Sequence, residues 1–145
     1  MKTVTLTWQP DRDRFEAAGG HAGQSVRINA PHGDGPPAGF SAAELLLAAA
    51  AGCSAWDVVE ILRKQRQTLS GLEVAVHGTQ ASSPPNQFTD VELAYTAHGT
   101  GLDAAKVERA VLLSVERYCS VINTIRGVAR IATRVEIVEA TTPAA

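Results

Sequence analysis

The residues best suited to chemistry are the two cysteines, Cys53 and Cys119. A thiolate can attack an oxidant, and a second thiol can then convert the resulting sulfenic acid into a disulfide. That reaction needs Cα atoms about 4.4–6.8 Å apart, which the sequence alone does not establish. Alternatively, both cysteines are small apolar residues of a packed core. The chain has no CxxC motif and its four histidines are scattered, so we predict neither a metal site nor a cofactor.

An activated Cys53 would need a nearby cation. It lies about three turns into an expected helix, where the helix dipole no longer lowers a thiol pKa, and burial raises that pKa. Asp57, at i+4 on the same face, would raise it further if unpaired. We therefore expect a basic side chain from elsewhere in the chain, although each candidate could equally be a solvated surface charge. The candidates are Arg12, Arg14, Arg27 and Arg126.

The helix that carries Cys53 has a well-marked beginning. Ser41-Ala-Ala-Glu44 fits a capping box, and the flanking Phe40 and Leu45 fit a hydrophobic staple. The helix is expected to run to about residue 66, and its first half, residues 45–55, is apolar on every side. A helix that is apolar all round is buried all round, which a domain this small cannot achieve alone. We therefore expect a second copy of the chain to cover part of it.

The second cysteine ends the apolar stripe of another helix. Asp103 is expected to cap this helix, in which apolar residues recur with helical spacing as far as Tyr118 and Cys119. It continues or restarts through residues 120–125 and ends at Gly127. Alternating residues predict strands over 3–8, after the turn at 11–16, and over 25–29, 72–78, 88–98 and 128–138. The order β-β-β-α-β-β-α-β predicts an α+β fold with two long central helices.

Composition excludes several classes of protein. The chain has 145 residues, 13 of them basic and 15 acidic, and the net charge of −2 argues against a nucleic-acid-binding protein. The longest uninterrupted apolar run, residues 45–51, is too short to cross a membrane. The first residues alternate like a strand and lack the apolar core of a signal peptide. We expect a single domain over residues 1–145, soluble and cytoplasmic.

Two cysteine motifs resemble the OsmC/Ohr superfamily. The segment from Ser41 to Val59, with its run Leu-Leu-Leu-Ala-Ala-Ala-Ala-Gly-Cys53-Ser-Ala-Trp, is similar to the helix that carries the family's first cysteine. Leu113-Ser-Val-Glu-Arg-Tyr-Cys119-Ser-Val is similar to its second-cysteine segment. Phe88-Thr-Asp-Val-Glu-Leu-Ala-Tyr resembles the stretch between, so the resemblance covers essentially the whole chain.

The resemblance implies a fold, an assembly and a reaction. Family members are intertwined homodimers, and the active ones reduce organic hydroperoxides. Cys53 would be the thiolate that attacks the peroxide, and Cys119 the thiol that resolves it into a disulfide. A dithiol of the dihydrolipoyl type would then reduce that disulfide. We expect an apolar substrate pocket lined by Trp56, Phe40 and Tyr118, although Trp56, at i+3 from Cys53, could instead be ordinary core packing.

The chain departs from the hydroperoxide-resistance branch at one position. There, a Glu at the start of the first helix and an N-terminal Arg act around the reactive cysteine, but the position of that Glu is Ala43 here. The neighbouring Glu44 is the candidate replacement, and it could instead serve only the capping box. Arg12 is the first candidate for the arginine and Arg14 the second. The sequence looks more like a less characterised OsmC-like branch.

Two other functions fit the same residues. A redox-sensing or ligand-binding protein would form the disulfide slowly and hold a small molecule in the apolar interface, and the missing Glu favours it. A cysteine-dependent acyl transferase or thioesterase would need a histidine base, and neither helix contains one.

Overall fold

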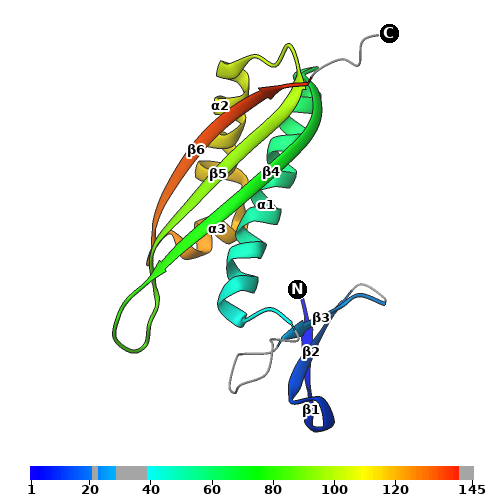
Figure 1. Cartoon of the computed structure of the whole chain (residues 1–145), viewed down its shortest axis with the longest axis vertical. Helices are drawn as coiled ribbons and strands as arrows, with labels where there is room; N and C mark the ends of the chain where they lie inside the picture. The colour runs from blue at the N-terminus through cyan, green and yellow to red at the C-terminus, as the bar shows by residue number, and fades with distance from the viewer. Residues whose placement is uncertain (21–22, 29–38, 141–145) are drawn as a thin grey trace. The chain divides into compact units, whose positions relative to one another are not determined.

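The computed structural model describes residues 1–20, 23–28 and 39–140. The chain divides into two compact units, Met1–Leu46 and Leu47–Ala145 (Figure 1). The long helix α1 (Ala42–Lys64) begins in the first unit and continues in the second. We describe each unit by itself.

The N-terminal unit contains a three-stranded antiparallel sheet. Its order is β1 (Val4–Gln9), β2 (Arg14–Gly19), β3 (Ser25–Ile28), and the short helix η1 (Pro10–Arg12) joins the first two strands. Trp8 and Phe15 face each other in the register of β1 and β2, with ring centroids 4.9 Å apart. Even so, Val4, Leu6 and Trp8 of β1 are exposed. The strands expected near residues 3–8 and 25–29 are confirmed.

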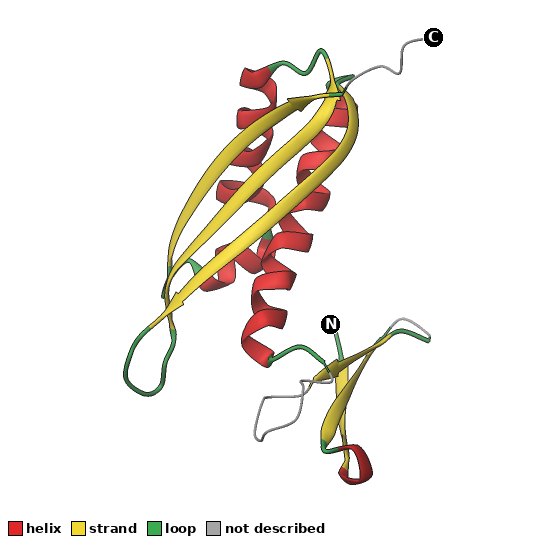
Figure 2. Ribbon diagram, viewed as in Figure 1, coloured by secondary structure: helices red, strands yellow, loops and turns green. Residues whose placement is uncertain are grey.

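The C-terminal unit packs helices on one face of a second three-stranded sheet (Figure 2). Strands β4 (Thr68–Gln80) and β5 (Phe88–Thr100) form an antiparallel hairpin, and β6 (Arg130–Glu139) lies parallel to β5. The central strand β5 buries every second residue toward the helices, namely Val91, Leu93, Tyr95 and Ala97. This period of two is the one expected of a sheet with one covered face.

Helix α1 is buried along one stripe only. Ala50, Ser54, Val58 and Leu62, spaced four residues apart, are fully buried. The remaining faces are partly or fully open, and the Trp56 side chain is 67% exposed. The single chain therefore covers only one side of this helix, and cover of the other sides by a second copy of the chain remains a prediction. One sheet and one neighbouring helical segment can cover only one side of a helix.

The second helical segment is interrupted. It comprises α2 (Ala104–Leu113), a π-helical turn η2 (Ser114–Tyr118) and α3 (Ser120–Ile125). Cys119 stands between η2 and α3 in an extended conformation, with φ −67° and ψ 104°. The expected cap of α2 is confirmed, because the Asp103 side chain accepts a hydrogen bond from the Lys106 N–H at 3.2 Å. The alternative of a restarted helix, rather than one continuous helix, is the observed one.

Helix α1 is long and apolar enough to cross a membrane, judged by length and composition alone. Its 23 residues include a window of mean hydropathy 1.7 that is 22% buried. The longest uninterrupted apolar run, residues 45–51, is much shorter than this window. Core helices of soluble proteins can meet the same criterion, and α1 packs one stripe into the core of the C-terminal unit.

Gly99 offers a test of how tightly β5 is packed. A Cβ at this position would overlap the Thr68 carbonyl oxygen and crowd the Leu102 side chain, whereas one at Gly127 meets no atom within 4 Å. We expect Gly99→Ala to lower the free energy of unfolding by about 1–3 kcal/mol, because overpacking forces the backbone apart. Gly127→Ala, the matched control, should change it by less than about 0.5 kcal/mol. Urea unfolding measures both, and equal midpoints for the two variants would contradict the packing described here.

Candidate functional site

The structure brings the two cysteines together in the C-terminal unit. Cys53 projects from α1, and the Cys119 thiol lies within hydrogen-bonding reach of it. The Cys119 sulfur is also 4.0 Å from the Ala50 carbonyl oxygen, one turn before Cys53. Both cysteines are free thiols; Cys119 is fully buried and Cys53 is partly exposed. An outside molecule therefore reaches Cys53 first.

The π-helical turn decides where Cys119 stands. The Cys119 N–H donates to the Ser114 carbonyl at 2.8 Å, five residues back, and the chain then opens into the extended conformation. In that conformation the Cys119 sulfur caps α3, accepting a hydrogen bond from the Ile122 N–H at 3.4 Å. Single π-turns often occur at functional sites. Here the turn places the sulfur against α1.

The surroundings separate the pKa values of the two thiols. Burial opposes ionisation of Cys53, but hydrogen bonds from the Val121 N–H, the Cys119 thiol and Ser120 outweigh it and lower the pKa of Cys53. Burial raises the pKa of Cys119 to about 11, and the neighbouring Cys53 sulfur contributes to the rise. The pair therefore combines a partly exposed thiol that ionises more readily, Cys53, with a buried thiol that ionises less readily, Cys119.

Two donors to Cys53 differ in kind from the basic side chain expected from the sequence. They are the Val121 N–H and Ser120, at the start of α3. The Ser120 hydroxyl lies 4.0 Å from the Cys53 sulfur. The only signal in the sequence was that a restarted helix must present free N–H groups at its first turn.

Asp57 does not stand unpaired beside Cys53. Its carboxylate accepts a hydrogen bond from the Ser114 hydroxyl at 3.0 Å. The same hydroxyl group lies 2.9 Å from that of Ser54, which in turn lies 2.5 Å from the Tyr95 hydroxyl. The carboxylate expected to oppose the Cys53 thiolate is therefore engaged in a polar network of its own.

Glu44 is engaged in the capping box. Its carboxylate accepts a hydrogen bond from the Ser41 N–H at 2.7 Å, and the Ser41 hydroxyl accepts one from the Glu44 N–H at 3.2 Å. The hydrogen bond from the Ser41 N–H is the main cause of a lowered pKa at Glu44. The local role weighed for Glu44 is thus confirmed, and a role at the cysteine remains a prediction.

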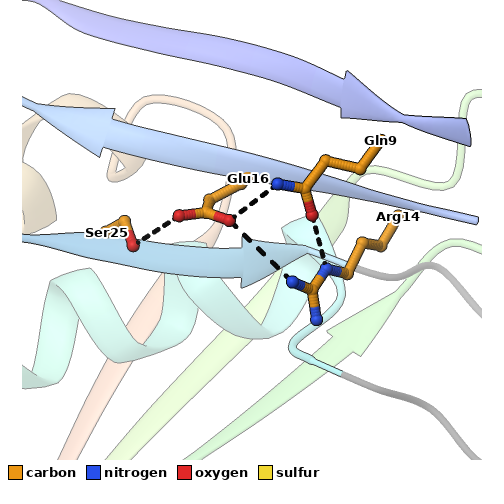
Figure 3. A network of polar contacts seen from close by, with 4 residues as sticks. All are labelled: Gln9, Arg14, Glu16 and Ser25. Carbon is orange, nitrogen blue, oxygen red and sulfur yellow. Dashed lines mark hydrogen bonds and ion pairs between the residues drawn. The ribbon is translucent and has the colours of Figure 1, made fainter. Parts of the chain in front are cut away.

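Arg12 and Arg14, the two candidates for the N-terminal arginine, differ in how they are held, and Figure 3 shows the contacts of Arg14. Arg12 is exposed in the last turn of η1, whereas Arg14 is buried. The Arg14 Nε donates to the Gln9 side chain at 2.7 Å, and its Nη2 lies 3.9 Å from the Glu16 carboxylate. Glu16 also accepts hydrogen bonds from Gln9 and Ser25, which lower its pKa. Gln9 and Glu16 therefore hold the Arg14 guanidinium in place, whereas the side chain of Arg12, the first candidate, is exposed. A role for either arginine near Cys53 remains a prediction.

The other two arginines have different surroundings. The Arg126 guanidinium donates to the Val115 carbonyl at 2.5 Å and so ties α3 back to the π-helical turn. Arg27 lies exposed on β3, where its carbonyl accepts a hydrogen bond from the Phe40 N–H at 3.1 Å. Arg126 therefore holds the Cys119 segment in place.

The three residues expected to line a substrate pocket are all open to solvent within the chain. Trp56 and Tyr118 belong to the C-terminal unit and Phe40 to the N-terminal unit, and each side chain is more than half exposed. Tyr118 and Leu113 line a cavity of about 450 Å³ beside α1. Its other lining residues are Asp57, Glu60, Ile61, Lys64 and Gln65. Trp56 is not core packing in the single chain, and its place in a substrate pocket remains a prediction.

Within the described ranges, no three His, Cys, Asp or Glu side chains are grouped so that they could hold a metal ion. The polar groups that contact the thiols in the described residues include the Ser120 hydroxyl, the Val121 and Ile122 N–H groups and the Ala50 carbonyl. Such groups orient thiols and protons.

Sequence comparisons relate this chain to known proteins. A family model described as OsmC-like protein matches residues 32–134. Protein YhfA of Escherichia coli K12 is 38% identical over 125 residues, which cover 86% of this chain and 89% of YhfA.

Two solved structures share the fold. The OsmC-like protein of Mycoplasma pneumoniae superimposes with a TM-score of 0.80 at 18% identity, covering 95% of this chain and 97% of that one. An organic hydroperoxide resistance protein OsmC from Legionella pneumophila does so with a TM-score of 0.68 at 19% identity, covering 94% and 96%. With a family match over most of its length and a closely related sequence in YhfA, the chain belongs to the OsmC-like family.

Proposed function

We propose that this protein is a thiol-dependent peroxidase that reduces organic hydroperoxides. Membership of the OsmC-like family supports a redox or stress-related role. The observation that carries the finer proposal is the pair of thiols: an accessible Cys53 of lowered pKa in contact with a buried Cys119 of raised pKa. A solved protein of the same fold is described as an organic hydroperoxide resistance protein.

The reaction follows from the two thiols. The Cys53 thiolate attacks the terminal oxygen of the hydroperoxide, the O–O bond breaks, and the alcohol leaves after taking up a proton. Cys53 is now a sulfenic acid. The Cys119 sulfur attacks it, forming a disulfide and releasing water, to which Cys119 gives its proton. An external dithiol, of the lipoyl type or another, then reduces the disulfide by exchange and is itself oxidised.

A homodimer would complete the site. Each unit exposes large apolar side chains, among them Leu6 in the N-terminal unit and Trp56 and Tyr118 in the C-terminal unit. Exposed apolar side chains that gather on one face are typical of an interface. Family members are typically dimeric. In the dimer a partner would cover the faces of α1 that the single chain leaves open, and an arginine, Arg12 or Arg14, together with Glu44, would act near Cys53.

A second function has one observation in its favour. Ala43 stands at the position of the Glu expected from the resemblance to the hydroperoxide-resistance branch, and the neighbouring Glu44 carboxylate is held by Ser41. Without that Glu, Cys53 would oxidise slowly and once, as a redox-sensing or ligand-binding protein of the cytoplasm would. Repeated turnover in the presence of a dithiol distinguishes the enzyme from this alternative.

Substitution of each cysteine should block a different step of the reaction. Cys53→Ser should abolish consumption of cumene hydroperoxide in the presence of dihydrolipoamide, because no nucleophile remains. Cys119→Ser should still oxidise once, leaving a Cys53 sulfenic acid that dimedone traps and intact mass detects. Turnover by Cys53→Ser would overturn the proposal, and one equivalent of oxidation without turnover in the unsubstituted protein would favour the sensor.

The thiols should also differ in their response to pH. The rate of iodoacetamide alkylation follows the thiolate fraction. For Cys53 it should rise with a midpoint below the ordinary thiol value of about 8.5, while Cys119 should remain unmodified until the pH approaches about 11. Peptide mapping of the alkylated protein across the pH range measures both. Faster labelling of Cys119 at neutral pH would contradict the assignment of roles.

The assembly can be tested with one substitution. Light scattering after gel filtration should give about twice the chain mass of 15.2 kDa. Trp56→Glu should shift the protein toward the monomer, because a carboxylate would replace an apolar side chain in the interface. Circular dichroism provides the control that the variant remains folded. A monomer mass for the unsubstituted protein at micromolar concentration would refute the dimer.

A further inference from the structure

Three buried hydroxyl groups form a continuous chain beside the two thiols. Ser54 on α1, Tyr95 on β5 and Ser114 at the start of η2 are all fully buried. The Tyr95 hydroxyl lies 2.5 Å from that of Ser54, which lies 2.9 Å from that of Ser114. The Ser114 hydroxyl reaches the Asp57 carboxylate at 3.0 Å. This chain of hydrogen bonds joins three elements that are distant in the sequence, namely α1, β5 and η2.

The carboxylate gives this chain a direction. An ionised Asp57 can only accept, and the Ser114 hydroxyl lies closer to it, at 3.0 Å, than to its other acceptor, the Ser54 carbonyl, at 3.3 Å. When Ser114 donates to Asp57, Ser54 can donate to Ser114 and Tyr95 to Ser54. Burial raises the pKa of Tyr95 to about 12, so the tyrosine keeps the hydrogen that it donates. Hydrogen bonds that run in one direction polarise one another and strengthen the whole chain.

Each of the two cysteines is linked to a residue of this hydrogen-bond chain. Ser54 directly follows Cys53 on α1. The Ser114 carbonyl accepts the N–H of Cys119 at 2.8 Å, in the bond that closes the π-helical turn. Ser114 therefore binds α1 through its side chain and Cys119 through its backbone. A shift of Ser114 away from Ser54 would carry Cys119 away from Cys53.

We propose that the Tyr95–Ser54–Ser114–Asp57 chain positions Cys119 for disulfide formation, with Ser114 as the main positioning residue and Tyr95 as its support. The inference rests on the proposed function for its first step only. Cys53 sulfenic acid and the Cys119 thiol react to give a disulfide and water, and the attacking sulfur must be held in line with the sulfenic sulfur. Apolar side chains at these positions could fill the space, but they would not fix the turn relative to α1.

The test separates the two steps of the reaction. Ser114→Ala and Tyr95→Phe are treated with one equivalent of cumene hydroperoxide, with and without dimedone, and quenched at intervals for intact mass and peptide mapping. Oxidation of Cys53 should proceed at the unsubstituted rate, because neither hydroxyl contacts its sulfur. Disulfide formation should slow about tenfold in Ser114→Ala, and less in Tyr95→Phe, so that the dimedone adduct accumulates. Tyr95→Phe preserves the test if Ser114→Ala does not fold.

A control variant distinguishes positioning from general loosening. Val58→Ala removes a buried apolar group one turn from Ser54 and is expected to destabilise the fold without touching the hydroxyl chain. Its disulfide should form at the unsubstituted rate. If Val58→Ala slows disulfide formation as much as Ser114→Ala does, the positioning role is overturned.

A second measurement does not depend on peroxidase activity. In dithiothreitol redox buffers, a tenfold weaker disulfide in Ser114→Ala should shift the midpoint potential of the Cys53–Cys119 couple by about 30 mV toward more oxidising values. Failure of the unsubstituted protein to react with hydroperoxide would refute the proposed function, and this shift would still support the positioning role. Equal potentials for the unsubstituted protein, Ser114→Ala and Tyr95→Phe would overturn the positioning role, whatever the peroxidase result.

Discussion

The contact between α1 and the π-helical turn is the interaction on which the rest of the site depends. Helix α1 buries one residue in four, and Ala50 and Ser54 of that stripe flank Cys53 along the helix. The turn approaches at this point, with the Cys119 sulfur near the Ala50 carbonyl and the Ser114 hydroxyl at Ser54. The same stripe that anchors the helix in the core therefore also sets the geometry of the two thiols.

This contact also explains why two chemically identical side chains differ. Cys119 lies in the buried seam, so burial raises its pKa, whereas Cys53 stands at the edge and receives hydrogen bonds from the start of α3. Among the described residues, hydrogen bonds rather than a basic side chain are the cause of the lowered Cys53 pKa. Arg126, a candidate for that role, instead binds the Val115 carbonyl and steadies the turn.

The beginning of α1 differs from the sequence expected from the resemblance to the hydroperoxide-resistance branch. Ala43 replaces the expected Glu, while Glu44 and Ser41 form a complete capping box. A carboxylate that satisfies the free N–H groups of a helix start is less available to another site. Arg14, in turn, is pre-oriented by Gln9 and Glu16 in the sheet of the N-terminal unit. Glu44 and Arg14 are therefore each held by polar groups of their own segment of the chain.

The sequence by itself determined the features that depend on near neighbours in the chain. The capping box at Ser41, the Asp103 cap and the alternation of β5 each arise from residues a few positions apart, so their patterns could be read directly. The cysteine motifs likewise identified the family. The tertiary structure decided what depends on distant groups. The donors that lower the Cys53 pKa lie 66, 67 and 68 positions away, and the hydroxyl that binds Asp57 lies 57 positions away. No local pattern encodes such contacts, because burial and hydrogen bonding between remote residues exist only once the sheet and helices have packed.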